Sequence, residues 1–267
     1  RRVAVGDHGI IEFRPSGNTV RLSADRRRDP RRFAVAKDSD GKILTAPEME
    51  IREGEGFTRS SGPGELQLPG DPSGEGLSKS ATRVIYGEKG QMVYNELGLN
   101  IRVYDNVRVV QAGFGDSWAM PSLDGRCDRL DIILLEPAMG DMRGGETLSK
   151  VNRMDATGNV LIRTYADPPP ENLNIDWLSR PGITFFVRGD QGVYLVREGR
   201  IEVSCPPGRR AQLLLNMVDD GGGMPRRQRM KADRFILDAN SRPRRWTSDG
   251  QLESNAMAYG EAFEFLD

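Results

Sequence analysis

Short runs in which apolar and polar residues alternate dominate the sequence. In DATGNVLIRT (155–164), Ala156, Val160 and Ile162 fall on one side, and polar residues such as Arg163 fall on the other. A strand with one buried and one solvated face has this period of two. Comparable runs, rich in β-branched and aromatic residues and bounded by Gly, Pro, Asn or Asp, occupy 100–111, 129–136, 158–164, 182–189, 192–199, 200–205, 211–217 and 234–238. The pattern predicts an all-β protein.

Helical periodicity is hard to find. The best candidate is 254–265, which Gly260 interrupts and which fits a last strand equally well. Stretches rich in Pro and Gly predict loops, the last of them a flexible surface loop, at 70–76, 166–173 and 219–229. We expect residues 1–267 to form one continuous region, in which two stacked sub-units would meet near 115–130.

Two sequence elements recur along the chain. In the first, a small residue, then Asp or Thr, then Arg precede an alternating apolar strand, as in SATRVIY (80–86), RCDRLDII (126–133) and KADRFILD (231–238). In the second, Asn-Val precedes alternating apolar residues, in YDNVRVV (104–110) and ATGNVLI (156–162). Each unit supplies a turn and a strand that cannot bury its own apolar face. Stacked units would therefore share a continuous apolar interior.

The charge argues against a dedicated nucleic-acid binder. A formal net charge of −1 contrasts with the strong basic excess of such proteins. Arginine is nevertheless clustered in three places, at 26–32, 226–229 and 242–245. We interpret these clusters as solvated loop charge or, alternatively, as rim residues whose guanidinium groups meet phosphates or carboxylates.

The cysteines and the apolar runs give no sign of a metal site or of a membrane-spanning helix. Cys127 and Cys205 lack the spacing and the companion histidines of a metal site, so we expect either buried thiols or a single disulfide. No apolar run reaches the roughly 18 residues of a membrane-spanning helix. The chain begins at Arg1, and a preceding signal peptide or membrane anchor is compatible with the sequence.

The sequence lacks a recognisable catalytic or cofactor motif. His8 is the single histidine, and no G-x-S-x-G motif accompanies it. DSDG (38–41) places Met49 where a calcium loop needs a Glu, and GFGDSW (113–118) lacks the third glycine of a dinucleotide site. VDD (218–220) runs into three glycines, which is typical of solvated loop acids rather than a glycosidase pair. We therefore expect no enzyme, no metal and no cofactor.

The three tryptophans are scattered singly, as Trp118, Trp177 and Trp246. They fit core or strand-edge packing, and alternatively a platform on which sugars or bases stack.

The recurring elements resemble those of the LptA/OstA-like β-jellyroll family, which is associated with lipopolysaccharide transport and organic-solvent tolerance. ATGNVLIRT (156–164) is similar to the GNV strand of that family, and KADRFILD (231–238) and CDRLDIIL (127–134) are similar to its Ala/Ser-Asp element. EGFTRSSGPGELQLPG (55–70) and GITFFVRGDQGVYLVREGRIEV (182–203) also fit the family pattern. The resemblance extends over roughly 43–250. The loops, however, are long, and Arg often replaces the small residue expected after the Asp.

This resemblance implies a folded-over antiparallel sheet, open like a V along one side, whose apolar interior shields acyl chains. It implies binding of lipopolysaccharide or other glycolipid acyl chains, a periplasmic or envelope location, and association with LptA-, LptC- or LptD-like jellyrolls through edge strands. The alternating pattern is compatible with lipid binding on physical grounds, because an open sheet with an apolar inner face must be closed by packing or filled by an apolar ligand.

Alternation along the strands gives candidates for the inner face of such a groove, with ordinary sandwich core as the other interpretation. The candidates are Val107, Val109, Ile133, Leu135, Val160, Ile162, Phe185, Val187, Val193, Leu195, Leu213, Leu215, Phe235 and Leu237. A slip of one residue would exchange the two faces, above all in DIILLE (131–136), where both are apolar.

Three functions fit the sequence. The first is a non-enzymatic envelope protein that binds or bridges lipid in an apolar groove. The second is a structural module of an envelope assembly with the same fold and a closed, dry core. The third is a β-solenoid enzyme acting on polysaccharides, which the absence of acids at a fixed repeat offset disfavours.

Overall fold

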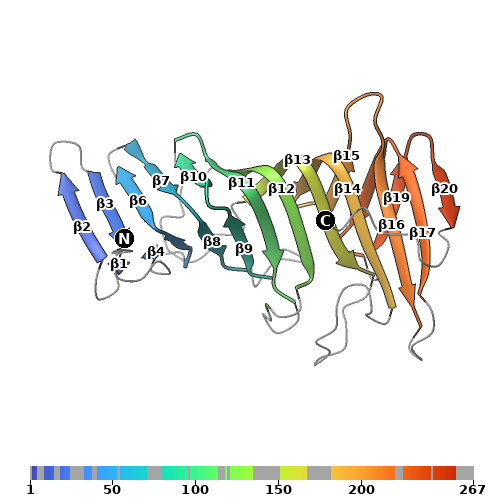
Figure 1. Cartoon of the computed structure of the whole chain (residues 1–267), viewed down its shortest axis with the longest axis horizontal. Coiled ribbons are helices and arrows are strands. Elements are labelled where there is room, and N and C mark those ends of the chain that lie inside the picture. Colours follow the sequence, from blue (N-terminus) through green and yellow to red (C-terminus); the bar gives the residue numbers. More distant parts are fainter. Residues whose placement is uncertain are drawn as a thin grey trace.

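The protein is built from antiparallel strands. The computed structural model describes residues 2–4, 9–14, 19–24, 33–37, 41–52, 55–70, 80–95, 97–113, 118, 121–134, 151–166, 182–219, 225–241 and 243–256. In this part of the chain it contains twenty strands and no helix, and every strand pairing is antiparallel. The strands lie across the long axis of the molecule, from β2 at one end to β17 and β20 at the other (Figure 1). The expectation of an all-β, folded-over antiparallel sheet is confirmed.

Four long strands form the centre of the sheet and pair in sequence order. They are β11 (Asn100–Gln111), β12 (Leu123–Leu134), β13 (Val151–Tyr165) and β14 (Gly182–Leu195). Each pairing shifts register near the middle of the strands, at Tyr104/Val107, Arg126/Arg129 and Thr157/Val160. Such bulges bend a strand and increase its twist. The row of bulges, here called the fold line, therefore divides every long strand into two halves.

The recurring Asn-Val element forms the bulges of β11 and β13. Asp105 and Asn106 have φ values of 72° and 48°, and Gly158 and Asn159 have values of 76° and 46°. Glycine enters this left-handed region without steric cost, and Asn and Asp do so more readily than other residues. The element noticed in the sequence is thus a device that bends the sheet.

On one side of the fold line the half-strands join a first layer. Its ladder runs through β2 (Gly9–Arg14), β3 (Thr19–Ala24), β6 (Glu48–Arg52), β7 (Phe57–Ser61), β10 (Gln91–Asn95), the four half-strands, β15 (Arg200–Ser204), β18 (Arg234–Asp238) and β19 (Arg245–Asp249).

On the other side the half-strands join a second layer. Its ladder runs through β1 (Arg2–Ala4), β4 (Ala34–Lys37), β5 (Ile43–Ala46), β8 (Gly64–Leu68), β9 (Thr82–Tyr86), the four half-strands, β16 (Ala211–Val218), β17 (Arg226–Ala232) and β20 (Glu253–Ala256). Residues 226–229, expected in a loop, thus belong to β17.

The apolar core lies between the two layers. It extends continuously from Leu22 in β3 to Leu237 in β18, with the largest enclosed side chains including Tyr86, Met92 and Phe235. Across this core the hydroxyl groups of Ser60 in β7 and Tyr86 in β9 form a hydrogen bond of 2.5 Å. This bond connects the first layer to the second.

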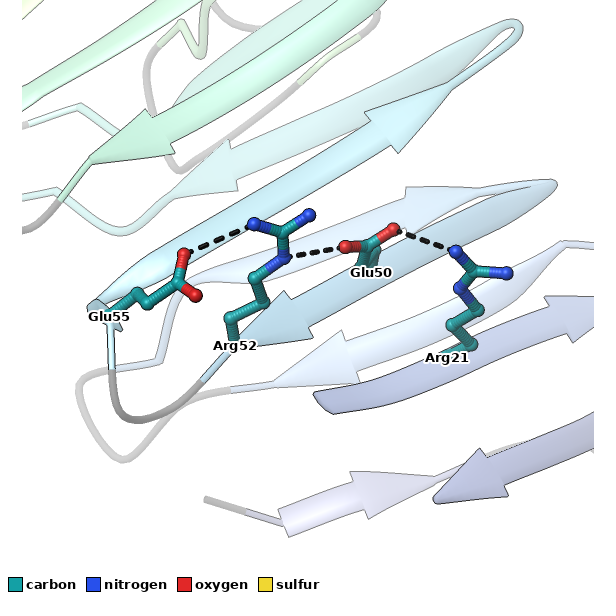
Figure 2. Close-up of polar contacts among 4 residues, drawn as sticks. All are labelled: Arg21, Glu50, Arg52 and Glu55. Carbon is teal, nitrogen blue, oxygen red and sulfur yellow. Dashed lines mark hydrogen bonds and ion pairs between the residues drawn. The ribbon is translucent and has the colours of Figure 1, made fainter. Parts of the chain in front are cut away.

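Ion pairs cover the outer face of the first layer. Figure 2 shows a chain of four side chains, Glu55, Arg52, Glu50 and Arg21, on β3, β6 and the turn that follows β6. The N–O distances are 3.1 Å for Glu55–Arg52, 2.7 Å for Arg52–Glu50 and 3.4 Å for Arg21–Glu50. The hydrogen bond from Arg52 lowers the pKa of Glu50.

Candidate functional site

The candidate site is the apolar inner face enclosed by the two layers. Most of the side chains expected on this face are there. Eight are buried in the continuous core, namely Val107, Val160, Ile162, Phe185, Val187, Leu213, Phe235 and Leu237. Two more, Val109 and Leu215, are partly buried and pack against it.

Three of the expected inner residues lie on the outer face instead, and the bulges explain why. In β14 the inward positions are Phe185 and Val187 before the fold line, but Gly192 and Tyr194 after it. Val193 and Leu195, which lie opposite Asp155 and Arg153, therefore face outward by alternation, although Val193 still borders the cavity.

In β12 the inward positions likewise change from odd-numbered to even-numbered residues at the fold line. Cys127 is inward before it, and Leu130 and Ile132 are inward after it. Ile133 consequently faces outward, opposite Arg153. The remaining candidate, Leu135, lies outside the described residues.

A small apolar cavity lies within the inner face, at the four long strands. Its volume is about 60 Å³, and its walls are almost entirely apolar. They include Leu130, Met154, Val160, Ile162 and Ile201, so both layers contribute. Ligand pockets for drug-sized molecules usually measure about 300–1,000 Å³. The interior therefore holds space for a short apolar group as it stands, and a longer chain requires the layers to separate.

Polar side chains border the cavity where the ends of the long strands meet, opposite the fold line. We call this edge the mouth. Gln111 at the end of β11 and Tyr194 near the end of β14 both line the cavity there. The Gln111 amide donates to the Thr82 hydroxyl over 3.4 Å. Burial raises the pKa of Tyr194 to about 12, although the neighbouring Arg244 and Gln111 oppose this shift.

Arg244 closes the mouth. It follows β18 of the first layer, yet its backbone N–H donates to the Ala166 carbonyl oxygen at the end of β13, over 2.7 Å. Its guanidinium Nη1 donates to the Ser122 carbonyl oxygen over 2.9 Å and to the Thr164 hydroxyl over 2.8 Å. The guanidinium carbon also lies 5.6 Å from the centre of the Tyr165 ring. Arg244 thus contacts four residues on the side of the second layer, namely Ser122, Thr164, Tyr165 and Ala166.

The cysteines are free thiols and not a disulfide. Cys127 lies on the inner face of β12, where burial raises its pKa to about 12. Cys205 is half-buried after β15, and burial also raises its pKa. Neither thiol forms the reactive thiolate at neutral pH.

Trp118 and Trp246 have separate packing roles. The Arg83 guanidinium carbon lies 4.0 Å from the centre of the Trp118 ring, and Trp246 packs against the core from β19. Trp177 and His8 lie outside the described residues.

Neither a metal site nor a membrane-spanning helix occurs among the described residues. No group of three His, Cys, Asp or Glu side chains among them has the geometry of a metal site. The structure, in the part that it describes, has no helix with the length and apolarity that crossing a membrane requires.

The ends of the ladder offer unpaired strand edges. In the described part of the chain, β2 pairs only with β3 and β1 only with β4. At the opposite end β19 pairs only with β18, and β20 only with β17. An edge strand exposes backbone N–H and C=O groups with which another strand can pair.

Sequence reasoning missed the residues that border and close the mouth. Gln111 is the last residue of an expected strand. Simple alternation placed Tyr194 on the outer face, because the inward positions of β14 change from odd-numbered to even-numbered residues at the fold line. Arg244 belongs to a noticed arginine cluster, whose alternative interpretation was a rim position. Its location at a rim matches that alternative, and its partners there include a hydroxyl, backbone carbonyls and an aromatic ring.

Comparison with known proteins adds evidence of structural likeness. No family model matches the chain, and no curated protein matches it. A solved structure that it resembles is LptH from Pseudomonas aeruginosa, described as the LptA-homologous periplasmic component of the lipopolysaccharide transport device. The identity is 8% and the TM-score 0.40, over 66% of this chain and 95% of LptH. Family membership therefore stays a prediction, and the fold is established by the strand pairing of the chain itself.

Proposed function

We propose that this protein is a non-enzymatic lipid-binding β-jellyroll of the cell envelope, which shields the acyl chains of a lipopolysaccharide-type glycolipid between its two layers. The observation that carries the proposal is the apolar cavity between the layers, bordered by Val160 and Ile162. It lies on a core that continues in both directions along the molecule. An acyl chain that entered there would meet apolar side chains throughout.

The energetics favour such a ligand once the layers separate. Each buried methylene contributes about 0.8 kcal/mol, so a chain of several methylenes offsets the loss of some contacts between the layers. Arg244 makes several of the polar contacts that resist separation at the mouth. The mouth is therefore the proposed point of entry.

The edge strands support the proposed mode of association. Strand pairing with LptA-, LptC- or LptD-like jellyrolls, or with other copies of this chain, would continue both layers beyond β1 and β2 or beyond β19 and β20. The apolar interior would then continue from one molecule into the next, in a periplasmic or envelope location.

A dry structural module is the second candidate. The observation in its favour is the tight packing of the inner face, where Val187, Phe235 and Leu237 have no exposed surface. In this alternative the core serves only for stability.

Photo-crosslinking from β18 separates the two candidates. Phe235 faces the interior and the adjacent Ile236 faces outward, so they form a matched pair. We expect benzoylphenylalanine at Phe235 to give lipopolysaccharide adducts and the same residue at Ile236 to give few.

The result that would overturn lipid binding is the absence of adducts from Phe235 while Ile236 still gives them. Because a large group at Phe235 can disturb folding, Val160 supplies a second inward position. Circular dichroism then checks that each labelled protein retains its strands.

A further inference from the structure

A second site lies on the second layer next to the fold line, and it shares Arg126 and Cys127 with the lining of the apolar cavity. Three arginines, Arg108 in β11, Arg126 in β12 and Arg188 in β14, line an open cleft of about 560 Å³. We call it the arginine cleft. Its remaining lining residues are Ile85, Tyr86, Gly87, Asn106, Val107, Cys127, Asp128, Asn159 and Leu161.

The strand register explains why these three side chains meet. Arg108 lies directly opposite Arg126, Arg126 lies opposite Leu161, and Leu161 lies opposite Arg188. The four residues thus form one row across β11–β14, on the outer face of the second layer next to the fold line. Neighbouring strands are about 4.7–4.9 Å apart, so long arginine side chains from this row can reach one ligand.

Two of the three arginines form no ion pair with a residue in the described part of the chain. Arg108 is neutralised by the enclosed Asp124, to which it donates from Nε over 2.9 Å and from Nη2 over 3.0 Å. Arg126 and Arg188 are exposed and make no ion pair with any residue that the structure describes. Asp128, the carboxylate in the lining, accepts a hydrogen bond of 2.9 Å from the Asn159 amide.

The outer face of the first layer shows the contrasting arrangement. There Arg21 and Arg52 share Glu50 (Figure 2). Arg129 also lies 2.7 Å from Asp131, and Arg153 lies 2.6 Å from Asp155. These outward arginines are paired with acids of the same chain, whereas Arg126 and Arg188 form no ion pair with a described residue, although Asp128 lies in the same cleft. Arg126 and Arg188 therefore leave positive charge in the row that no described acid neutralises and that an external anion can balance.

We propose that the arginine cleft binds the phosphoryl group of a ligand. Guanidinium groups bind phosphate through paired, parallel hydrogen bonds, which makes arginine better suited than lysine to this task. Asn106 and Asn159 bring amide groups that can donate to the same anion. The cleft adjoins the apolar interior through Arg126 and Cys127, but the proposal rests on the arginines and does not depend on what occupies that interior.

Calorimetric titration with inorganic phosphate, at constant ionic strength in chloride, tests the site. The double variant Arg126→Gln/Arg188→Gln should bind phosphate about tenfold more weakly or worse, because each lost charge-assisted bond costs at least that factor. Both positions are exposed, so the fold should persist, and circular dichroism checks this.

The matched control removes the same charge elsewhere. Arg197, in the turn after β14, and Arg245, in β19, are exposed and form no ion pair with a described residue. Arg197→Gln/Arg245→Gln should leave phosphate affinity within about twofold of the unchanged protein, since loss of exposed charge alone has little effect on a specific site. Equal weakening in both double variants, or none in either, would overturn the proposal.

Two further measurements define the ligand and the geometry. Arg126→Lys/Arg188→Lys keeps the charge but loses the planar fork, so its affinity should lie between those of the unchanged and the glutamine proteins. Sedimentation with phosphatidylcholine vesicles, with and without phosphatidic acid, separates a lipid headgroup from a soluble phosphate. If the protein sediments only with vesicles that contain phosphatidic acid, and the Arg126→Gln/Arg188→Gln variant does not, the ligand is a lipid headgroup. Phosphate binding in calorimetry without vesicle binding assigns the soluble ligand.

Discussion

Single buried hydroxyl groups couple the two layers. The hydrogen bond between Ser60 and Tyr86 joins β7 to β9 within an otherwise apolar environment. Burial raises the pKa of Tyr86 to about 12, although the bond from Ser60 opposes the shift. The folded state therefore favours the protonated phenol more strongly than the unfolded state does.

Replacing Tyr86 by Phe has two expected effects. At neutral pH the variant should lose about 1 kcal/mol of unfolding free energy, because the Ser60 hydroxyl loses its partner. Since the pKa of Tyr86 is raised on folding, its contribution is complete below pH 10 and is lost as the pH rises towards 12. The stability difference between the two proteins should therefore shrink or reverse in alkali.

Urea denaturation at pH 8 and at pH 11 measures this difference. Tyr104→Phe is a suitable control, because that tyrosine lies beside the exposed Arg129 and not in the core. An equal stability difference at both pH values for Tyr86→Phe would contradict the assigned pKa shift.

At the scale of elements, the bulges decide which side chains face inward. In β13, Val160 and Ile162 keep the parity that the sequence suggested, because Gly158 and Asn159 take up the bulge in left-handed conformations. In β12 and β14 the parity changes across the fold line, so Ile133 and Leu195 face outward. The recurring Asn-Val element was visible in the sequence, but its function as a bend depends on the strands beside it.

Gly158→Ala should destabilise the bend. Gly158 has a φ of 76°, and a Cβ atom there would meet the Asp128 carboxylate at 2.3 Å. We expect a loss of about 1–3 kcal/mol, from backbone strain together with the collision. Gly208→Ala is the control, because it has a φ of 87° but no atom within 4 Å of the added Cβ.

Thermal unfolding of both variants provides the measurement. A larger decrease in Tm for Gly158→Ala than for Gly208→Ala is the expected result. Equal decreases would show that the contact with Asp128 contributes nothing beyond backbone strain.

At the scale of the whole molecule, Arg244 connects the layers at the mouth. Its contacts with Ser122, Thr164 and Ala166 lie across the edge through which the proposed ligand enters. Under the proposed function, opening this edge is the conformational step that acyl-chain binding would require.

Arg244→Ala should loosen the mouth and leave the fold line intact. We expect faster hydrogen exchange at the amide of residue 244, whose bond to the Ala166 carbonyl oxygen would lose the support of the guanidinium contacts. Exchange at the amide of Gly87, bonded to Asp105 at the fold line, should be unchanged. Faster uptake of a fluorescent fatty acid by this variant would support entry at the mouth. Unchanged exchange at residue 244 would show that the guanidinium does not hold the mouth closed.

The sequence by itself determined the all-β class and the apolar face of most long strands. Alternation with a period of two is a local property of the sequence. It therefore identifies Val107, Val187 and Leu213 as inward residues without knowledge of the strands beside them. The strands before residue 100 were harder to recognise, because short, polar segments such as Glu48–Arg52 become strands mainly through their partners.

Only the tertiary structure decided which way Ile133, Val193 and Leu195 face, that Arg244 closes the mouth, and that Arg126 and Arg188 share a cleft. Each depends on register between strands that are distant in sequence, and one bulge reverses the facing of all the residues that follow it. The width of the interior was likewise fixed by packing of the two layers, because side chains from β3 to β18 fill it together.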